Sequence, residues 1–300
     1  MIPRPLFRAL YHAAIALGRP VGGLRPRCIY DRLARLAYDR PEHRWVRNRW
    51  GHELYLSHYH HFDRNILILG TYDAPLHEAL ERLLQPGMTA FDVGANFGEI
   101  ALHMAARVDD AGAVYAFEPI PNVYDHLRRH VERNGLQQVI RTYPLALSDQ
   151  TGHAEIAFAP PTADNQGLAS IVNLTDQAGP LRAQIPTMTL DDFVRQEHIE
   201  RIDVIKIDIQ GAEPRFLQGA RETLERFRPH LLMEFSPTDL RQSGLTSRDL
   251  ARQLEELGYD IRPVTAKKFG PPLAPATLSD NFHAPNVLCT YRVKHEDMKT

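Results

Sequence analysis

The clearest pattern in the chain is an alternation of short apolar runs with amphipathic segments, which begins at residue 89. Residues 89–93 have strand character, a glycine-containing turn and a helical segment follow, and 113–118 form a second apolar run. The next amphipathic segment has Pro121 near its start and Gly135 just past its end, which are the usual helix start and stop signals. Strands that alternate with helices predict right-handed crossovers and a parallel sheet.

The same alternation continues to the end of the chain. We predict five further strands, at 139–147, 202–209, 231–235, 259–264 and 287–292. The helix before residue 259 opens with Thr246 and Asp249 as a capping box and stops at Gly258. The pattern therefore predicts a Rossmann-like α/β fold with a seven-stranded, mostly parallel sheet, helices on both faces and an antiparallel C-terminal strand.

Two regions depart from this alternation. Residues 1–70 form an N-terminal extension with a helix-like start and a strand-like stretch at 53–56, in contrast to the α/β domain expected over 71–300. Within that domain, residues 150–186 are polar and contain proline and glycine, with one strand-like run at 153–158. Long loops in compact domains are usually functional, so we expect this insertion to lie over the ligand-binding edge of the sheet.

Composition limits the partners and the compartment. The 35 basic and 37 acidic residues give a formal charge of -2, which argues against a nucleic-acid partner and for a small-molecule acceptor. Cys28 and Cys289 are far apart and form no disulfide framework, which predicts a reducing compartment and a cytoplasmic location. No apolar run reaches the roughly 20 residues that a transmembrane helix needs. Residues 1–20 are basic and amphipathic, which leaves open a peripheral membrane contact beside the expected docked surface helix. A homo-oligomer is also left open.

The turn after the first predicted strand carries the first chemical signal. Gly94 and Gly98 remove side chains that would block a charged cofactor from the backbone. A dinucleotide fingerprint reads G-x-G-x-x-G, and here Asn96 occupies its third position, where a glycine is required. Asp92 stands two residues before the first glycine. An acid at that point repels a pyrophosphate but suits a cofactor that carries an ammonium and a sulfonium.

Polar residues also follow the next two predicted strands. Glu118 ends the second strand, where a carboxylate accepts hydrogen bonds from both hydroxyls of a ribose. Ser148 and Asp149 follow the third strand, where Asp149 would accept the exocyclic amine of an adenine. Each acid taken alone also has a non-functional explanation, as a helix cap, a turn residue or a solvated side chain. Three acids at three successive strand ends favour a binding site.

Four runs together resemble the FkbM family of methyltransferases: 92–98, 116–119, 146–149 and 205–213. The likeness covers roughly residues 70–236 and implies a class I fold, S-adenosylmethionine as methyl donor, and O-methylation of a hydroxyl on a sugar, glycan or polyketide-like acceptor. Tyr72 is similar to an aromatic residue before the family's core and would reach the amino-acid end of the donor. The predicted donor site is Tyr72, Asp92, Gly94, Ala95, Asn96, Gly98, Glu118, Pro119, Ser148, Asp149 and Asp208. Gln210 stands where the family typically has Glu, so we place it with the acceptor and carry over no carboxylate role.

Methyl transfer is an in-line displacement, so the enzyme mainly aligns the acceptor oxygen with the methyl group in a dry site. An alcohol acceptor also benefits from a base. Asp208, at the end of the fourth strand, is the first candidate, and Glu213 and Glu234 are the others. Alternatively, Glu213 stabilises a helix N-terminus, and Lys206 is a structural ion-pair partner for one of the acids.

A histidine cluster lies within the N-terminal extension. On a strand, His58 and His60 would share a face, and with His61 we assign them to the acceptor pocket. The same pair would suit a metal, but no third ligand is evident, so we predict no metal site. Asp208 with Glu234 would suit Mg²⁺, although two carboxylates do not specify it.

Three other functions compete with O-methylation. N-methylation of a small-molecule amine needs similar donor machinery, and fold alone does not choose the acceptor. A nucleotide-dependent oxidoreductase would use the same sheet edge, but the broken glycine spacing counts against it. A non-catalytic binding module would have lost the strand-end acids that this chain keeps.

Overall fold

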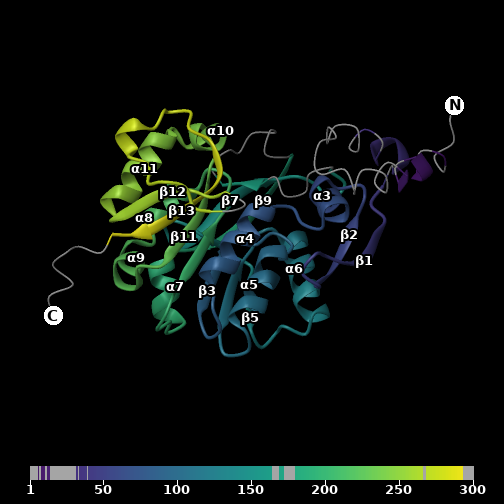
Figure 1. Ribbon diagram of the computed structural model, residues 1–300, viewed down its shortest axis with the longest axis horizontal. Helices are drawn as coiled ribbons and strands as arrows, with labels where there is room; N and C mark the ends of the chain where they lie inside the picture. The colour runs from purple at the N-terminus through teal and green to yellow at the C-terminus, as the bar shows by residue number, and fades with distance from the viewer. Residues whose placement is uncertain are drawn as a thin grey trace. The chain divides into compact units, whose positions relative to one another are not determined.

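The computed structural model describes residues 6, 8–10, 12, 13, 32, 34–38, 40–163, 169–171, 180–265 and 268–292. The chain divides into two compact units (Figure 1). The first consists of Met1–Asp73 with Ala159–Gly167, and the second of Ala74–Phe158 with Leu168–Thr300. Cys28 and residues 14–20 of the basic segment lie outside the described ranges.

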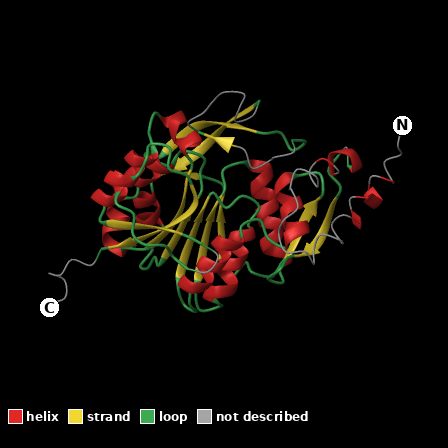
Figure 2. Cartoon of the chain, turned by 45° about the horizontal axis from the view of Figure 1, so that its top comes forward, coloured by secondary structure: helices red, strands yellow, loops and turns green. Residues whose placement is uncertain are grey.

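A seven-stranded sheet forms the centre of the second unit and confirms the predicted architecture. Its strands are β3 (Thr89–Val93), β4 (Ala113–Phe117), β5 (Ile140–Tyr143), β10 (Val204–Ile207), β11 (His230–Phe235), β12 (Tyr259–Pro263) and β13 (Ala284–Tyr291). They lie side by side in the order β12-β13-β11-β10-β3-β4-β5 (Figure 2). The pairs from β11 to β5 are parallel, and β13 runs antiparallel to both β11 and β12. The predicted C-terminal antiparallel strand is therefore β13.

Helices cover both faces of this sheet. They are α4 (Ala74–Leu83), α5 (Glu99–Val108), α6 (Pro121–Arg133), α7 (Leu190–Gln196), α8 (Glu213–Gln218), α9 (Arg221–Phe227), α10 (Pro237–Leu240) and α11 (Ser247–Glu256), with 3-10 turns at Arg241–Ser243 and Pro275–Thr277. Phe91 and Ile205 point to the face that packs against α7, α8, α9 and α11, in the main hydrophobic core. Because strand side chains alternate, Asp92 and Lys206 point to the opposite face. The predicted capping box at Thr246 and Asp249 is present at the start of α11.

A second, four-stranded sheet corrects the prediction for residues 139–147. That run is two strands, β5 and β6 (Ala146–Leu147), and β6 pairs with β9 (Leu181–Met188) in the order β6-β9-β7-β8. Pro144 lies between them, and a proline has no N–H to donate to a sheet. The other two strands are β7 (Gly152–Phe158), which contains the predicted strand-like run, and β8 (Ala169–Ser170). Much of the region expected as an insertion is thus a sheet, and its position over the ligand-binding edge stays a prediction.

The first unit is built around a hairpin and a helix. β1 (His43–Arg47) pairs with β2 (Glu53–Ser57) in antiparallel register, and His43 lies opposite Ser57. Helix α3 (His61–Leu69) follows and ends at Gly70, whose φ of +84° is a left-handed cap that glycine adopts without strain. Across the described residues, none of the helices has the length and apolarity that crossing a bilayer requires.

Candidate active site

The centre of the sheet is the point at which the strand order reverses. β4 and β5 lie on one side of β3, and β10 and β11 lie on the other. In open α/β sheets, ligands bind beyond the carboxyl ends of the strands at such a point. Val93 pairs with Ile207, and the amide of Asp208 donates to the carbonyl of Val93 at 3.1 Å. The turn that follows β3 and the predicted base therefore meet at one edge.

The backbone amides of residues 94–98 are all hydrogen-bonded within the protein. They pair as follows: Gly94 and Ala95 with the carbonyl of Phe117 at 3.1 and 2.8 Å, Asn96 with Glu118 Oε2 at 3.0 Å, Phe97 with Asn96 Oδ1 at 2.9 Å, and Gly98 with the carbonyl of Ala95 at 2.9 Å. A dinucleotide site instead presents the backbone amides of this turn to the pyrophosphate. Hydrogen bonding therefore adds to the charge argument against a dinucleotide.

The two glycines of this turn are required by the protein itself as well as by the expected cofactor. Gly94 has a φ of +76°, and a Cβ there would lie 2.0 Å from the carbonyl oxygen of Asp208. Gly98 has a φ of +93°, and its Cβ would lie 2.5 Å from Leu127 Cδ1 of α6. At Gly94 both the left-handed backbone and the backbone contact oppose a side chain, whereas at Gly98 the left-handed backbone is the main obstacle, because the end of the Leu127 side chain can move.

Asp92 and Lys206 form a buried ion pair across the neighbouring strands β3 and β10. The two residues are in register, and Lys206 Nζ lies 3.1 Å from Asp92 Oδ1. The same ammonium donates to the carbonyl of Gly94 at 2.7 Å, so it also fixes the turn. Burial alone lowers the pKa of Lys206, but Asp92 and Asp208 raise it, and the pKa lies above its ordinary value. The sequence suggested Lys206 as an ion-pair partner for Asp208, Glu213 or Glu234, whereas the structure pairs it with Asp92.

Glu118 joins the end of β4 to the turn after β3. Its Oε2 accepts from the amide of Asn96, and its Oε1 accepts from the amide of Ile120 at 2.9 Å. Burial raises the pKa of Glu118 to about 7, although these two amides oppose the shift. A carboxylate has about four acceptor positions. Two acceptor positions therefore remain for the ribose hydroxyls that the sequence predicts there. Pro119, the next residue, is partly exposed.

Ser148 and Asp149 lie at the end of β6, in the smaller sheet, whereas the third strand of the main sheet ends at Tyr143. The expectation that they follow the third main strand is therefore wrong, because that run breaks at Pro144. The Ser148 hydroxyl donates to Asp149 Oδ1 at 2.9 Å, and the Ser148 amide donates to the carbonyl of Met188 at 2.9 Å. The pair lies on a different element from the one expected, and the contact of Asp149 with an adenine stays a prediction.

The segment after β10 contains Asp208, Gln210 and Glu213. Asp208 is partly exposed, and Gln210 Nε2 lies 3.4 Å from its Oδ1, with Gln210 itself at a φ of +54°. Glu213 is buried and accepts from the amide of Ile209 at 3.2 Å. Burial raises the pKa of Glu213 to about 7. Glu213 therefore stabilises the turn from the protein interior. A catalytic base would instead need a carboxylate that an acceptor can reach.

Glu234 lies near the end of β11, the strand beside β10. The β11–β13 register shifts between Met233 and Phe235, so Glu234 occupies an irregular position in the ladder. Such bulges re-aim side chains and are common beside active sites. Because Ile207 pairs with Met233, Glu234 and Asp208 follow on adjacent strands at the same edge.

Four predicted site residues, Tyr72, His58, His60 and His61, belong to the first compact unit. Tyr72 stacks on Phe62 with ring centroids 3.9 Å apart. His61 begins α3, and its Nε2 lies 3.3 Å from the side-chain nitrogen Nδ2 of Asn65. The contact of Tyr72 with the donor stays a prediction, as does the place of the histidines in an acceptor pocket.

The expectation that His58 and His60 share a strand face is wrong, because β2 ends at Ser57 and residues 58–60 form a turn. His58 stacks on Tyr38, and its Nε2 lies 2.8 Å from Arg44 Nη2. Burial, and then Arg44, lower the pKa of His58 to about 3, so its ring is neutral near pH 7. His60 has different partners, described below.

The sheet order, the acidic turn and the strand-end carboxylates together define a Rossmann-like methyltransferase. The chain belongs to the FkbM family: the model described as "Methyltransferase FkbM domain" matches residues 92–261. It is therefore an S-adenosylmethionine-dependent methyltransferase, which excludes the oxidoreductase alternative.

Curated relatives are similar at low identity. The 2-O-methyltransferase NoeI of Sinorhizobium fredii is 28% identical over 188 residues, which cover 58% of this chain and 74% of that protein. Methyltransferase sdnD of Sordaria araneosa is 26% identical over 195 residues, which cover 57% of this chain and 73% of that protein. The hexuronic acid methyltransferase AglP of Haloferax volcanii is 24% identical over 166 residues, which cover 55% of this chain and 61% of that protein.

Proposed function

We propose that the protein methylates a hydroxyl group on a sugar, a glycan or a polyketide-like small molecule. The observation that carries the proposal is the position of Asp208, a partly exposed carboxylate at the strand-order reversal, next to the turn at Gly94. The names of two relatives support the acceptor class, because one is a 2-O-methyltransferase and another acts on a hexuronic acid.

The residues at this edge fit S-adenosylmethionine. Asp92, Lys206 and Asp208 together carry an excess of one negative charge, which suits a donor with an ammonium and a sulfonium. Glu118 keeps acceptor positions for a ribose. We assign the donor to Asp92, Gly94, Ala95, Asn96, Gly98, Glu118, Pro119, Ser148, Asp149 and Asp208, with Tyr72 at its amino-acid end.

In the proposed reaction the bound donor supplies a methyl group already activated by its sulfonium. Asp208 accepts a hydrogen bond from the acceptor hydroxyl, orients its oxygen and takes its proton as the C–O bond forms. The methyl–sulfur bond of the donor breaks in the same step, and adenosylhomocysteine is the leaving group. Glu234, on the adjacent strand, is the second carboxylate that acts on the acceptor. Glu213 is a positioning residue, because its carboxylate is bonded to the amide of Ile209 and holds the segment that carries Asp208.

The test is to incubate the enzyme with S-adenosylmethionine and a panel of uronic acids, neutral sugars, polyketide alcohols and small amines. We expect a product 14 mass units heavier, about the mass of one CH₂, from an alcohol, and a kcat that falls on the order of 10²-fold or more in Asp208→Asn. Glu222→Gln, at a largely exposed carboxylate, is the control with unchanged kcat. Methylation of amines alone, or an unchanged kcat in Asp208→Asn, would contradict the proposal.

The cytoplasmic location, the membrane contact of residues 1–20, the lack of a nucleic-acid partner and the oligomeric state stay predictions from the sequence. So does any role of Mg²⁺ at Asp208 and Glu234.

A further inference from the structure

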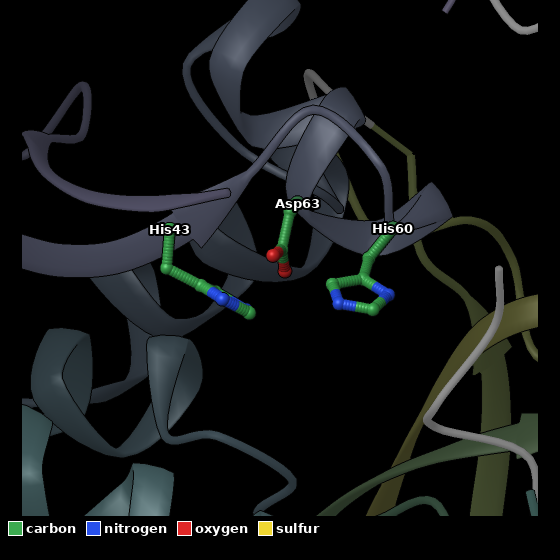
Figure 3. A group of neighbouring side chains, drawn as sticks. All are labelled: His43, His60 and Asp63. Carbon is green, nitrogen blue, oxygen red and sulfur yellow. The ribbon is translucent and has the colours of Figure 1, made fainter. Parts of the chain in front are cut away.

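Three side chains of the first compact unit converge on one point. His43 is the first residue of β1, His60 precedes α3, and Asp63 lies in the first turn of α3. One potential ligand atom from each lies within 4.8 Å of the others. Figure 3 shows the Asp63 carboxylate between the two imidazole rings. Within the part of the chain that the structure describes, this is the one such group of His, Cys, Asp or Glu.

The local fold produces this convergence. His60 and Asp63 are three residues apart at the start of a helix, so their side chains lie on the same side. The β1–β2 hairpin places His43 opposite Ser57, and the amide of Ser57 donates to Asp63 Oδ2 at 2.8 Å. Hairpin and helix are therefore locked together at the position where His43 meets Asp63.

Each of the three side chains is oriented by a second group. His60 Nδ1 lies 2.9 Å from the carbonyl oxygen of Ala163. A carbonyl can only accept a hydrogen bond, so Nδ1 carries the hydrogen and the lone pair is on Nε2. In Figure 3 one ring nitrogen of His60 faces the other two side chains and the other points away. The ring of His43 stacks on Tyr55, with centroids 5.1 Å apart.

Metal-binding histidines have the same arrangement, in which the second ring nitrogen donates to a carbonyl or a carboxylate and fixes the tautomer. Metal-binding carboxylates are likewise hydrogen-bonded through their other oxygen, as Asp63 is by Ser57. His60 and Asp63 are also buried, at 3% and 7% exposure, so a metal there would be largely shielded from water.

We propose that His43, His60 and Asp63 bind a divalent transition-metal ion, with Zn²⁺ as the representative ion. Two imidazoles and one carboxylate suit zinc, iron, nickel and copper, whereas Mg²⁺ and Ca²⁺ prefer oxygen ligands alone. Three protein ligands leave one position of a tetrahedral ion for water or a further ligand. The proposal goes beyond the methyltransferase function and does not depend on it.

Sequence reasoning missed this site because it paired His58 with His60 as strand neighbours. The spacing His60-x-x-Asp63 at a helix start was the available signal. His43 was not predictable, since its approach depends on the hairpin register.

The experiment is a calorimetric titration of the tag-free full chain with Zn²⁺. We expect one ion per chain, and an affinity reduced on the order of 100-fold or more in His43→Ala, His60→Ala and Asp63→Asn. Asn at position 63 keeps an oxygen that accepts from Ser57, so this variant preserves the hairpin–helix contact. His153→Ala, at an exposed histidine of the second unit, is the matched control with unchanged affinity.

Far-UV circular dichroism and adenosylhomocysteine binding verify that each variant is folded. The visible absorption of bound Co²⁺ gives a second readout, because it reports the ligands directly, and we expect it to disappear in the same three variants. The absence of one-to-one binding to the folded wild-type chain would overturn the proposal. So would equal affinity in the three ligand variants and the His153→Ala control.

Discussion

Gly94 combines a left-handed backbone with a carbonyl packed against it, and both features are independent of any ligand. In Gly94→Ala the new Cβ would lie 2.0 Å from the oxygen of Asp208, so β3 and β10 must separate at their ends. We expect loss of adenosylhomocysteine binding and a lower free energy of unfolding, measured by calorimetry and urea denaturation.

Gly87→Ala provides the matched control for this substitution. Gly87 has a similar φ of +82°, but a Cβ there meets nothing within 4 Å. It should cost about 1–2 kcal/mol from backbone strain alone, with donor binding kept. If Gly94→Ala were no more destabilising than Gly87→Ala, the clash with Asp208 would not be real.

The Asp92–Lys206 pair makes a second prediction at the level of single residues. Lys206→Met would leave the fully buried carboxylate of Asp92 without its cation and free the carbonyl of Gly94. Breaking a buried pair from one side typically destabilises by about 3–5 kcal/mol. Urea denaturation of Lys206→Met should show a loss of that size.

The double variant Asp92→Leu with Lys206→Met distinguishes the pair from its two parts. Apolar residues of similar volume often replace a buried ion pair with little cost, so the double variant should recover much of the lost stability. A double variant less stable than Lys206→Met would show that Asp92 acts through other contacts.

For the turn at residues 94–98, the sequence predicted the important residues but not the packing contacts that require them. Glycines at 94 and 98 and an acid at 92 were read from spacing and charge, and all three lie at the strand-order reversal. The packing of Gly94 on Asp208 was not predictable, because it depends on the contact of β3 with a strand more than 100 residues later.

The turn between β10 and α8 is held by a buried acid, which makes its stability depend on pH. The folded pKa of Glu213, about 7, lies above its ordinary value of 4.5, so the folded state binds more protons between these values. The stabilising contribution is full below pH 4.5 and is lost as the pH rises through 7. In Glu213→Gln, which has no proton to lose, the unfolding free energy should fall less from pH 5 to pH 7.

The comparison requires urea denaturation of both proteins at several pH values, since other buried acids contribute to each curve. The difference between the curves isolates residue 213, with a limiting slope of about 1.4 kcal/mol per pH unit. Glu222→Gln, at an exposed position, should follow the wild-type curve. Parallel curves for the wild type and Glu213→Gln would refute a raised pKa.

Strand prediction succeeded where the local sequence alone indicates a strand. It failed where the strand boundaries depend on pairing with a distant segment. Residues 202–209 gave β10 because isoleucine and valine dominate the run, which is typical of a buried parallel strand, although Asp203, Lys206 and Asp208 interrupt it. Residues 139–147 also look apolar, but Pro144 divides them, and the second half pairs with β9 about 40 residues later. The turn at 58–60 was mistaken for a strand for a related reason, since helix α3 starts directly after it.

At the scale of the whole molecule, donor binding should raise thermal stability selectively. Adenosylhomocysteine at a hundred times its Kd adds about 2.7 kcal/mol to the unfolding free energy. NADH should give no shift in Tm, because the amides of residues 94–98 are already bonded within the protein. An equal shift with NADH would contradict the donor assignment made from this turn.

The internally bonded turn has a consequence for turnover. Because its amides are satisfied before any ligand arrives, the turn is preorganised, and in the proposed site donor and product would meet the same backbone surface, with little ordering entropy to lose. That surface therefore does not distinguish S-adenosylmethionine from adenosylhomocysteine. The two differ by the methyl group and its positive charge, so in the proposed site the carboxylates of Asp92 and Asp208 would discriminate between them. We expect adenosylhomocysteine to compete strongly with the donor for the site, and its release or removal to limit the turnover rate.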